Sequence, residues 1–368
     1  MPIFAEMELK SSKYWVSLAI PAILAIIIAF SSTKPHWIEI YYSNGLYPII
    51  SRFLRFIFGI FPFSIGDILY LLAIIFFIRK SIKFFISLKK SESRKTILGK
   101  ALFKSLRLIL WIYCFFNILW GLNYSRQGVK SAFDLQLQPI TPKDLVVLTK
   151  ILRDSVNANI APATDPFYEN GDISDIENDA YKSYEALERK YPFISIKTQS
   201  LKKSLFRKFG NYMGYQGYYN PFTGESQVNT NIPSFMIPFV ACHEIAHQAG
   251  FASESEANFV GFIAATHAEK KFVRYSAFLE MYLYASGQLI SVDTATAKSI
   301  ALELHPLAKN DIHKYINFLK DHSSIIQDGT NIFYDFYLKQ NDQKNGIRSY
   351  GEVTGWLVAY FKKEENKK

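Results

Sequence analysis

The segment Ala241–Gln248 holds the residues with the clearest capacity for chemistry. It contains His243, Glu244 and His247 in the spacing H-E-x-x-H, within an apolar stretch from Ser234 to Phe251. Four residues of α-helix advance the chain by about 400°, so the two histidines share one face, one turn apart. Two imidazoles so placed can bind Zn²⁺, and the glutamate can take a proton from a zinc-bound water. The spacing predicts one zinc ion per chain, with Glu244 as the general base.

A catalytic zinc site needs a third protein ligand, and two carboxylates follow the motif closely. Gly250 can reverse the chain after the first helix. Ser253 and Glu256 have the spacing of a capping box, which predicts that a second helix begins there. That role for Glu256 leaves Glu254 as the expected third ligand, and Glu256 remains the alternative.

Hydrolysis of a peptide bond also requires an oxyanion stabiliser and a surface that holds the substrate. The candidate stabilisers are Tyr218, Tyr219, Arg348 and Tyr350, and each of the tyrosines could instead be part of an aromatic core. Residues 212–217 and 227–230 are expected to be strands joined by a hairpin turn at 220–224. The second strand, Gln227-Val228-Asn229-Thr230, is the candidate edge for an extended substrate, and an ordinary surface hairpin is the alternative.

The rest of residues 125–368 is expected to be mainly helical. One helix is predicted from Thr141-Pro142 to about Asn159, a second from the capping box at Ser174 to Lys190, and a short one over 200–209. From Ser234 onward the pattern stays helical, with breaks near Gly250, Gly287, Pro306, Gly329 and Gly346.

Residues 1–124 have the composition of a membrane domain. Three transmembrane helices are predicted, over about 14–31, 66–88 and 104–123. The segment 37–63 combines aromatic residues with Arg52 and Arg55 and is expected to lie along the membrane surface. A fourth, distorted span is the alternative for this segment, although its polar residues would be costly in lipid.

The charge distribution gives the expected orientation. The chain carries 42 Lys and Arg against 32 Asp and Glu, and the whole excess falls in residues 1–124. Residues 125–368 are balanced, so no nucleic-acid partner is expected. The loop 79–107 is rich in Lys and Arg, which predicts that it and the N-terminus are cytoplasmic. Residues 125–368 then form the extracytoplasmic domain of a multi-pass membrane protein.

The order H-E-x-x-H, a turn, and a helix that begins E-x-x-A-N is similar to the gluzincin zinc peptidases. The resemblance implies that Glu254 is a zinc ligand and that Asn258 braces a ligand histidine. The whole chain also resembles an uncharacterised bacterial membrane family grouped with these peptidases. The motifs that carry this likeness are Tyr41-Tyr42-Ser43-x-Gly45-x-Tyr47-Pro48, Pro62-Phe63-Ser64-x-Gly66-Asp67, the segment 217–225, HExxHQ and Glu254-x-Glu256-Ala257-Asn258-Phe259.

Together these observations predict a mainly α protein with a small β element. Three N-terminal transmembrane helices are expected to carry a zincin-like extracytoplasmic domain. The leading hypothesis is a membrane-anchored zinc metalloprotease whose partners are a peptide or protein substrate and membrane lipid. The alternative is a membrane receptor or scaffold with a structural or vestigial zinc site.

Overall fold

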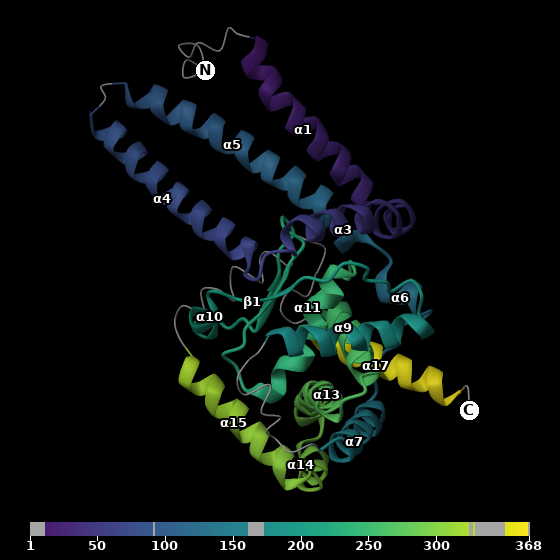
Figure 1. The fold of residues 1–368 in the computed structure, drawn as a ribbon. Coiled ribbons are helices and arrows are strands. Elements are labelled where there is room, and N and C mark those ends of the chain that lie inside the picture. Colours follow the sequence, from purple (N-terminus) through teal and green to yellow (C-terminus); the bar gives the residue numbers. More distant parts are fainter. Residues whose placement is uncertain (1–11, 91–92, 161–172, 324–326, 328–349, 367–368) are drawn as a thin grey trace.

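The computed structural model describes residues 12–90, 93–160, 173–323, 327 and 350–366. As predicted, the protein is mainly helical with one small sheet. Three long helices extend from a helical body that contains the sheet (Figure 1).

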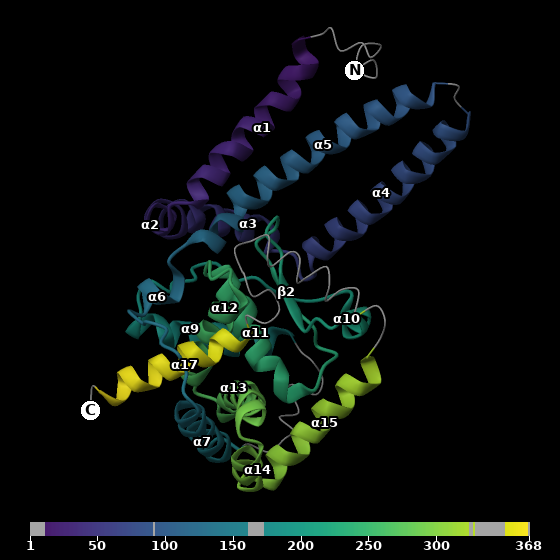
Figure 2. The ribbon, with the colours of Figure 1, turned by 180° about the vertical axis from the view of Figure 1, so that it is seen from behind.

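The three projecting helices are α1 (Ser12–Ser32), α4 (Ile65–Lys90) and α5 (Arg94–Leu119), which run side by side in both views (Figures 1 and 2). Among the described residues, two segments are long and apolar enough to cross a membrane, Tyr14–Ser32 and Arg94–Leu119. Helix α4 occupies the predicted second span, but Arg79, Lys80 and Lys83 interrupt its apolar sequence. The structure therefore supports two candidate spans at the coarse level and leaves the third a prediction.

The predicted interfacial segment is helical. It forms α2 (Pro35–Trp37), a π-helix (Ile38–Leu46) and α3 (Tyr47–Phe58). Helix α3 lies across the base of the projecting helices (Figure 1). Its buried face carries Tyr47, Ser51 and Arg55, spaced four residues apart. The opposite side is exposed and largely apolar, and its apolar residues are Ile49, Phe53, Phe56 and Ile57.

The sheet has three short strands, β1 (Leu201–Lys203), β2 (Gly217–Tyr219) and β3 (Ser226–Val228), in the order β1-β3-β2. Strand β3 pairs in parallel with β1 and antiparallel with β2. The predicted hairpin turn is present, but the strand predicted over 212–217 is wrong, because α10 (Arg207–Met213) covers its start and β2 begins at Gly217. The predicted helix over 200–209 is wrong as well, because β1 occupies its start. The prediction of Gln227–Thr230 as a free edge is also wrong, because β3 is the central strand.

The other helices of the body follow the sequence pattern closely. Helix α7 (Pro142–Ala158) begins at the predicted cap, where Thr141 and Asp144 form a reciprocal capping box. The remaining elements are α6 (Gly128–Ala132), α9 (Ile173–Lys190), α11 (Ile237–Gln248), α12 (Glu254–Thr266), α13 (Lys271–Val292), α14 (Thr294–Leu302), α15 (Pro306–His322), α17 (Tyr350–Glu365) and the 3₁₀ turns Gly121–Ser125 and Ser234–Met236. Pro306 begins a helix as expected, whereas α13 continues through Gly287. Gly329 and Gly346 lie outside the described residues.

Two apolar clusters organise the interior. The larger one lies in the body, where α11 and α12 bury nearly all of their residues. The smaller one joins the N-terminal segment to the body, and its members are Ile28, Ile38, Tyr42, Tyr47, Cys114, Trp120, Leu122, Tyr219 and Ala252. Helices α1 and α5 are therefore attached to the body through packed side chains.

Gly261 permits the close approach of α11 and α12. A Cβ atom at this position would lie 2.9 Å from both N and Cα of His243. Because backbone atoms cannot swing aside, we expect Gly261→Ala to lower the free energy of unfolding by about 1–3 kcal/mol. Denaturant unfolding would measure this. The matched control is Gly287→Ala in α13, where a Cβ meets nothing within 4 Å. This control should be neutral or slightly stabilising, and equal losses in both variants would contradict the packing argument.

Candidate metal centre

Helix α11 carries the H-E-x-x-H residues through the centre of the body. Pro238 stands in its first turn, where a proline leaves no intrahelical hydrogen bond unmade. Most of its residues are apolar and all of them except His243 are buried, including the free Cys242. The hydroxyl of Ser226 in β3 donates to the carbonyl of Glu244, at 2.8 Å. The motif is thus held between the sheet and α12.

Gly250 ends α11 in the way the sequence predicts. It has a φ of 84°, and the backbone N–H groups of Gly250 and Phe251 donate to the carbonyls of His247 and Ala246. This pattern is a Schellman motif. The reversal places the carbonyl of Phe251 2.8 Å from Nδ1 of His247. Since a carbonyl can only accept, Nδ1 carries the proton, and Nε2 is left with a lone pair for a cation.

Glu254, the first residue of α12, faces both motif imidazoles. Its carboxylate oxygens lie 3.3 Å from Nε2 of His243 and 3.6 Å from Nε2 of His247. One ligand atom from each of the three residues can be chosen so that all lie within 4.8 Å of one another. We call His243, His247 and Glu254 the metal cluster. In the described part of the chain, this is the group of side chains that can hold a metal ion.

The charges in the cluster suit a cation. Burial acts to raise the pKa of Glu254, but its hydrogen bonds with His243 and His247 hold that pKa well below the ordinary value. Burial acts to lower the pKa of His243, yet Glu254 and Glu244 outweigh it and raise the pKa to about 9. The carboxylate is therefore anionic and is stabilised by positive charge on the neighbouring imidazole, and a divalent ion bound between the two rings could replace that charge.

Glu256, the alternative ligand, points elsewhere. Its Oε1 accepts from the backbone N–H of Val129 at 2.9 Å, and a Cβ on Gly128 would collide with its carboxyl group. Glu256 thus caps the start of α6. The predicted capping box with Ser253 is not formed, because Ser253 makes no side-chain cap and its hydroxyl pairs with that of Ser255.

Asn258 lies beside His243, as the resemblance implied. Its amide is among the groups that raise the pKa of His243. Nδ1 of His243 and Nδ2 of Asn258 are nevertheless both buried and lack a hydrogen bond of good geometry. An imidazole fixed on a cation through Nε2 would need an acceptor at Nδ1, and the Asn258 amide oxygen is the nearest suited group.

Glu244 is buried next to the metal cluster and has an unused oxygen. Its Oε2 is buried without a hydrogen-bond partner. Burial raises the pKa of Glu244 to about 7, against the lowering effect of the two histidines. Strand β2 covers the side chain, because a Cβ on Gly217 would stand 2.6 Å from Oε1. A carboxyl group with a pKa near neutrality can both accept and return a proton.

The four candidate oxyanion stabilisers are not gathered around the cluster. The hydroxyl of Tyr218 donates to Asp67 at the start of α4, and that of Tyr219 pairs with the hydroxyl of Tyr47 at 3.2 Å. Arg348 lies outside the described residues, and Tyr350 begins α17 with a side chain outside the description. The geometry brings none of them to Glu244 in the described structure.

Gln248, the residue after the motif, has a role that local pattern does not reveal. It is buried, accepts from the hydroxyl of Tyr181 at 2.8 Å and donates to the carbonyl of Ser200 at 2.6 Å. It therefore ties α11 to α9 and to the start of β1.

Three donors from the N-terminal segment satisfy the carbonyls at the end of α11. The indole N–H of Trp120 donates to the carbonyl of His247 at 3.1 Å, and the hydroxyl of Tyr47 donates to that of Gln248 at 2.9 Å. Arg126 donates to the carbonyl of Gly250 at 3.0 Å and pairs with buried Glu39. These contacts fix the ligand-bearing turn to the base of the projecting helices.

We expect Trp120→Phe to weaken this attachment. The substitution removes the N–H donor and part of the ring that lies 5.8 Å from the imidazole of His247. The free energy of unfolding should fall by about 1–3 kcal/mol. Zinc affinity should fall by about 10- to 100-fold, as it does when other groups that orient a metal ligand are removed. Competition with a chelating dye would measure the affinity. Trp15→Phe, on the exposed face of α1, is the control and should change neither quantity.

Sequence reasoning missed Glu280 of α13. The backbone N–H of Phe239 in α11 donates to the hydroxyl of Ser276 in α13, at 3.0 Å. His243 lies four residues after Phe239 in α11, and Glu280 lies four residues after Ser276 in α13. Glu280 is buried, its Oε2 has no partner, and burial raises its pKa to about 7. Glu280 lies within a helical, largely apolar segment, and nothing in the neighbouring sequence indicates that it would lie near His243.

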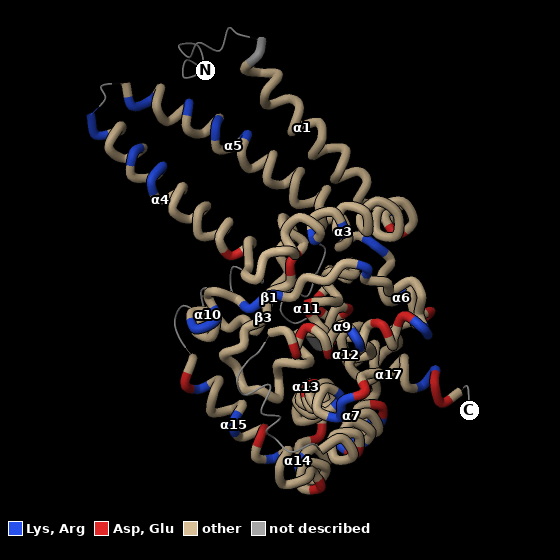
Figure 3. Tube along the Cα trace, in the orientation of Figure 1, with Lys and Arg blue, Asp and Glu red and all other residues tan. Residues whose placement is uncertain are grey.

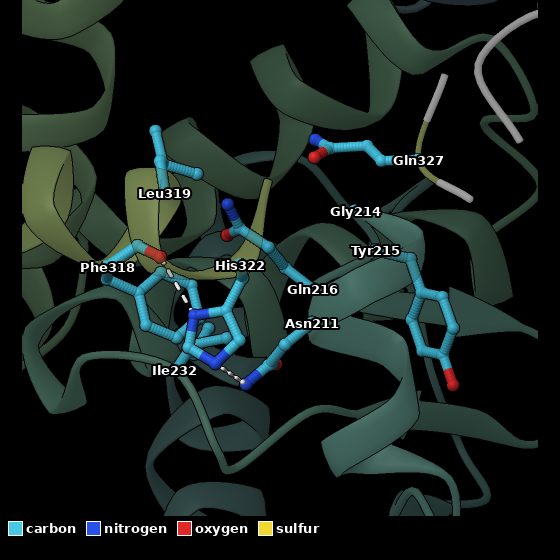
Figure 4. Close-up of a pocket in the computed structure, with 9 residues that line it drawn as sticks. All are labelled: Asn211, Gly214, Tyr215, Gln216, Ile232, Phe318, Leu319, His322 and Gln327. Carbon is cyan, nitrogen blue, oxygen red and sulfur yellow. Dashed lines mark hydrogen bonds between the residues drawn. The ribbon is translucent and has the colours of Figure 1, made fainter. Parts of the chain in front are cut away.

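A small cavity lies between α10 and α15, and no residue of the metal cluster lines it (Figure 4). It holds about 30 Å³, and its lining includes Asn211, Gln216 and His322. This is the space of about one water molecule. It is too small to receive a peptide side chain.

The fold and the cluster define a class: a mainly helical protein with helices able to span a membrane and a buried His/Glu group able to bind a metal. More particularly, the chain belongs to the family described as protein of unknown function (DUF3810), whose profile matches residues 42–358. No curated protein and no solved structure matches it. The matched range covers α3, α4 and α5 as well as the metal cluster, so the helices and the body occur together in this family.

Proposed function

We propose that the protein is a membrane-anchored zinc metallopeptidase. The observation that carries this is the convergence of His243, His247 and Glu254 within 4.8 Å, with Glu244 beside them. Two imidazoles and one carboxylate are a donor set that zinc accepts in catalytic sites. No fourth protein ligand joins them among the described residues, which favours a catalytic site over the alternative of a closed structural one.

Zinc, when bound, would supply a Lewis acid that polarises the peptide carbonyl and acidifies water. Glu244 would accept the proton of the attacking water and pass it to the leaving amine. The Phe251 carbonyl holds His247 in the ligating tautomer, and Asn258 would do the same for His243. Burial of Glu244 by β2 limits competing solvent at the proton-transfer step.

An extended substrate would pair with β2 instead of β3. The backbone bonds from Asn220 to Glu225 and from Asn229 to Gln216 set the antiparallel alternation. By that alternation Tyr218 bonds toward β3, while the N–H and C=O groups of Gly217 and Tyr219 point away from it. Main-chain pairing at this edge would bring a substrate past Glu244 without demanding a particular sequence.

The charge pattern supports three spans and an extracytoplasmic body. Lys and Arg gather on the halves of α4 and α5 that lie far from the body, as Figure 3 shows. Basic ends favour the cytoplasmic side. A reporter enzyme that works only outside the cytoplasm, fused after Asn123, should be active, and an inactive fusion would reverse the proposed orientation.

Metal content and metal dependence test the function together. The full chain, purified in detergent, should contain one zinc ion and cleave a degenerate mixture of peptides. A chelator should abolish cleavage and added zinc should restore it. Tight zinc without cleavage under any condition would favour the receptor or scaffold hypothesis, and cleavage that survives complete zinc removal would exclude the proposed mechanism.

A further inference from the structure

The metal cluster lies unusually close to the candidate membrane spans. Helix α5 ends at Leu119, and the next residue, Trp120, places its ring 5.8 Å from the imidazole of His247. Tryptophan is typical of the level where lipid headgroups meet the hydrocarbon. One side chain therefore separates the end of a candidate span from a proposed metal ligand.

Helix α3 gives a second, independent indication that the metal cluster lies close to the membrane side of the body. On its inner face, the Tyr47 hydroxyl lies 2.9 Å from the carbonyl of Gln248 at the end of α11. On its outer face, Ile49, Phe53 and Phe56 expose 62–71% of their surface. Helix α3 itself lies across the base of α1 and α5, and these two helices also expose many apolar residues (Figure 1). Lipid is the occupant that a surface continuous with membrane spans would meet.

A helix with its side chains is about 10–12 Å across. The lipid-facing surface of α3 is thus about one helix diameter from the end of the metal helix. The smaller apolar cluster fills the space between them and includes Tyr219 at the end of β2. The candidate substrate edge therefore begins at the membrane side of the body and runs inward to Gly217 beside Glu244.

We propose that the metal cluster lies at the surface of the bilayer and acts on polypeptide segments held against that surface, that is, on the chain beside a membrane anchor. This inference rests on the peptidase function proposed above and on α5 crossing the membrane. A substrate segment close to its own anchor reaches the cluster directly. A segment far from the membrane has to return to the surface to be cut.

Anchored peptides of two spacer lengths test this with the full chain in vesicles of phosphatidylethanolamine and phosphatidylglycerol. Each peptide has the same degenerate cleavable sequence and the same acyl anchor, attached at either end in separate sets. A flexible spacer of about four residues reaches about 14 Å, and one of about forty residues has a root-mean-square length of about 35 Å. The equal anchors enrich both peptides equally at the membrane.

The order of the two rates decides the matter. Effective concentration at the surface falls with roughly the −3/2 power of spacer length, so the short-spacer peptide should be cut about tenfold or more faster. A remote metal site would give the opposite order, because the short spacer could not reach it. Equal rates or a faster long-spacer peptide would overturn the inference, and Glu244→Gln protein provides the blank.

A second readout does not depend on hydrolysis. Co²⁺ bound in place of zinc should quench the fluorescence of lipids labelled on the headgroup, and Glu254→Gln protein, in which the proposed carboxylate ligand is removed, serves as the control. Bound Co²⁺ without quenching would overturn the surface position while leaving the metal site intact. Quenching without hydrolysis of any peptide would sink the peptidase proposal alone, and failure to bind metal would overturn both.

Discussion

Glu244→Gln protein should bind one zinc ion as tightly as the parent protein and lose peptide hydrolysis by about 10²–10⁴-fold. Gln keeps the shape and burial of Glu244 but cannot take a proton. The metal ligands His243, His247 and Glu254 are untouched, so zinc content should not change. Zinc analysis and initial rates on the same preparation would measure the two effects.

The role of Glu244 follows from comparing zinc content with the rate of hydrolysis in this variant. Loss of zinc together with activity would show that Glu244 holds the site together instead of transferring protons. Undiminished hydrolysis would remove Glu244 from the mechanism. Gly217 is the matched neighbour: Gly217→Ala places a Cβ 2.6 Å from Oε1 of Glu244 and should lower the rate with zinc retained.

The second large effect concerns the two carboxylates at the start of α12. Glu254→Gln should lower zinc affinity by more than the roughly 10- to 100-fold that is typical when only a ligand's supporting group is removed. Its oxygens stand 3.3 and 3.6 Å from the imidazole nitrogens of His243 and His247, and an amide is a far weaker ligand than a carboxylate. Isothermal titration of zinc into stripped protein would measure the loss.

Glu256→Gln is the control for this substitution. The Glu256 carboxyl accepts from Val129 N–H, and an amide oxygen can accept the same bond. Burial raises the pKa of Glu256 to about 7, so much of the parent protein already holds this group neutral at that pH. Zinc affinity should stay within a few-fold of the parent value. The reverse outcome, with Glu256→Gln losing zinc and Glu254→Gln keeping it, would transfer the ligand role to Glu256.

Local rules in the sequence were enough to predict the centre of the site. The four-residue spacing of the histidines, the glycine that reverses the chain and the carboxylate just beyond it all act within a dozen residues. Helix geometry and the left-handed preference of Gly250 fix where they point. The mainly helical class and the extended apolar N-terminal helices also follow from periodicity and composition.

The parts of the site that were predicted wrongly or missed depend on contacts between residues far apart in the sequence. Glu256 has the spacing of a capping residue, but the N-terminus of α6, 127 positions away in sequence, takes its carboxyl group. Strand β1 is three residues long, too short for a period-2 pattern, and its parallel pairing turns the expected edge strand into the central one. Glu280 comes near His243 only through the packing of α13 on α11.

The donors that close the end of α11 have a consequence for how the protein is made. Tyr47, Trp120 and Arg126 precede their carbonyl partners by 124 to 201 positions, so the ribosome delivers them first. Until these early residues are in place, the late segment lacks the groups that complete its turn, and each missing bond to a buried carbonyl costs about 1–3 kcal/mol. If the protein has the membrane topology and the zinc site proposed above, biosynthesis would therefore couple completion of the metal cluster to insertion of the early helices.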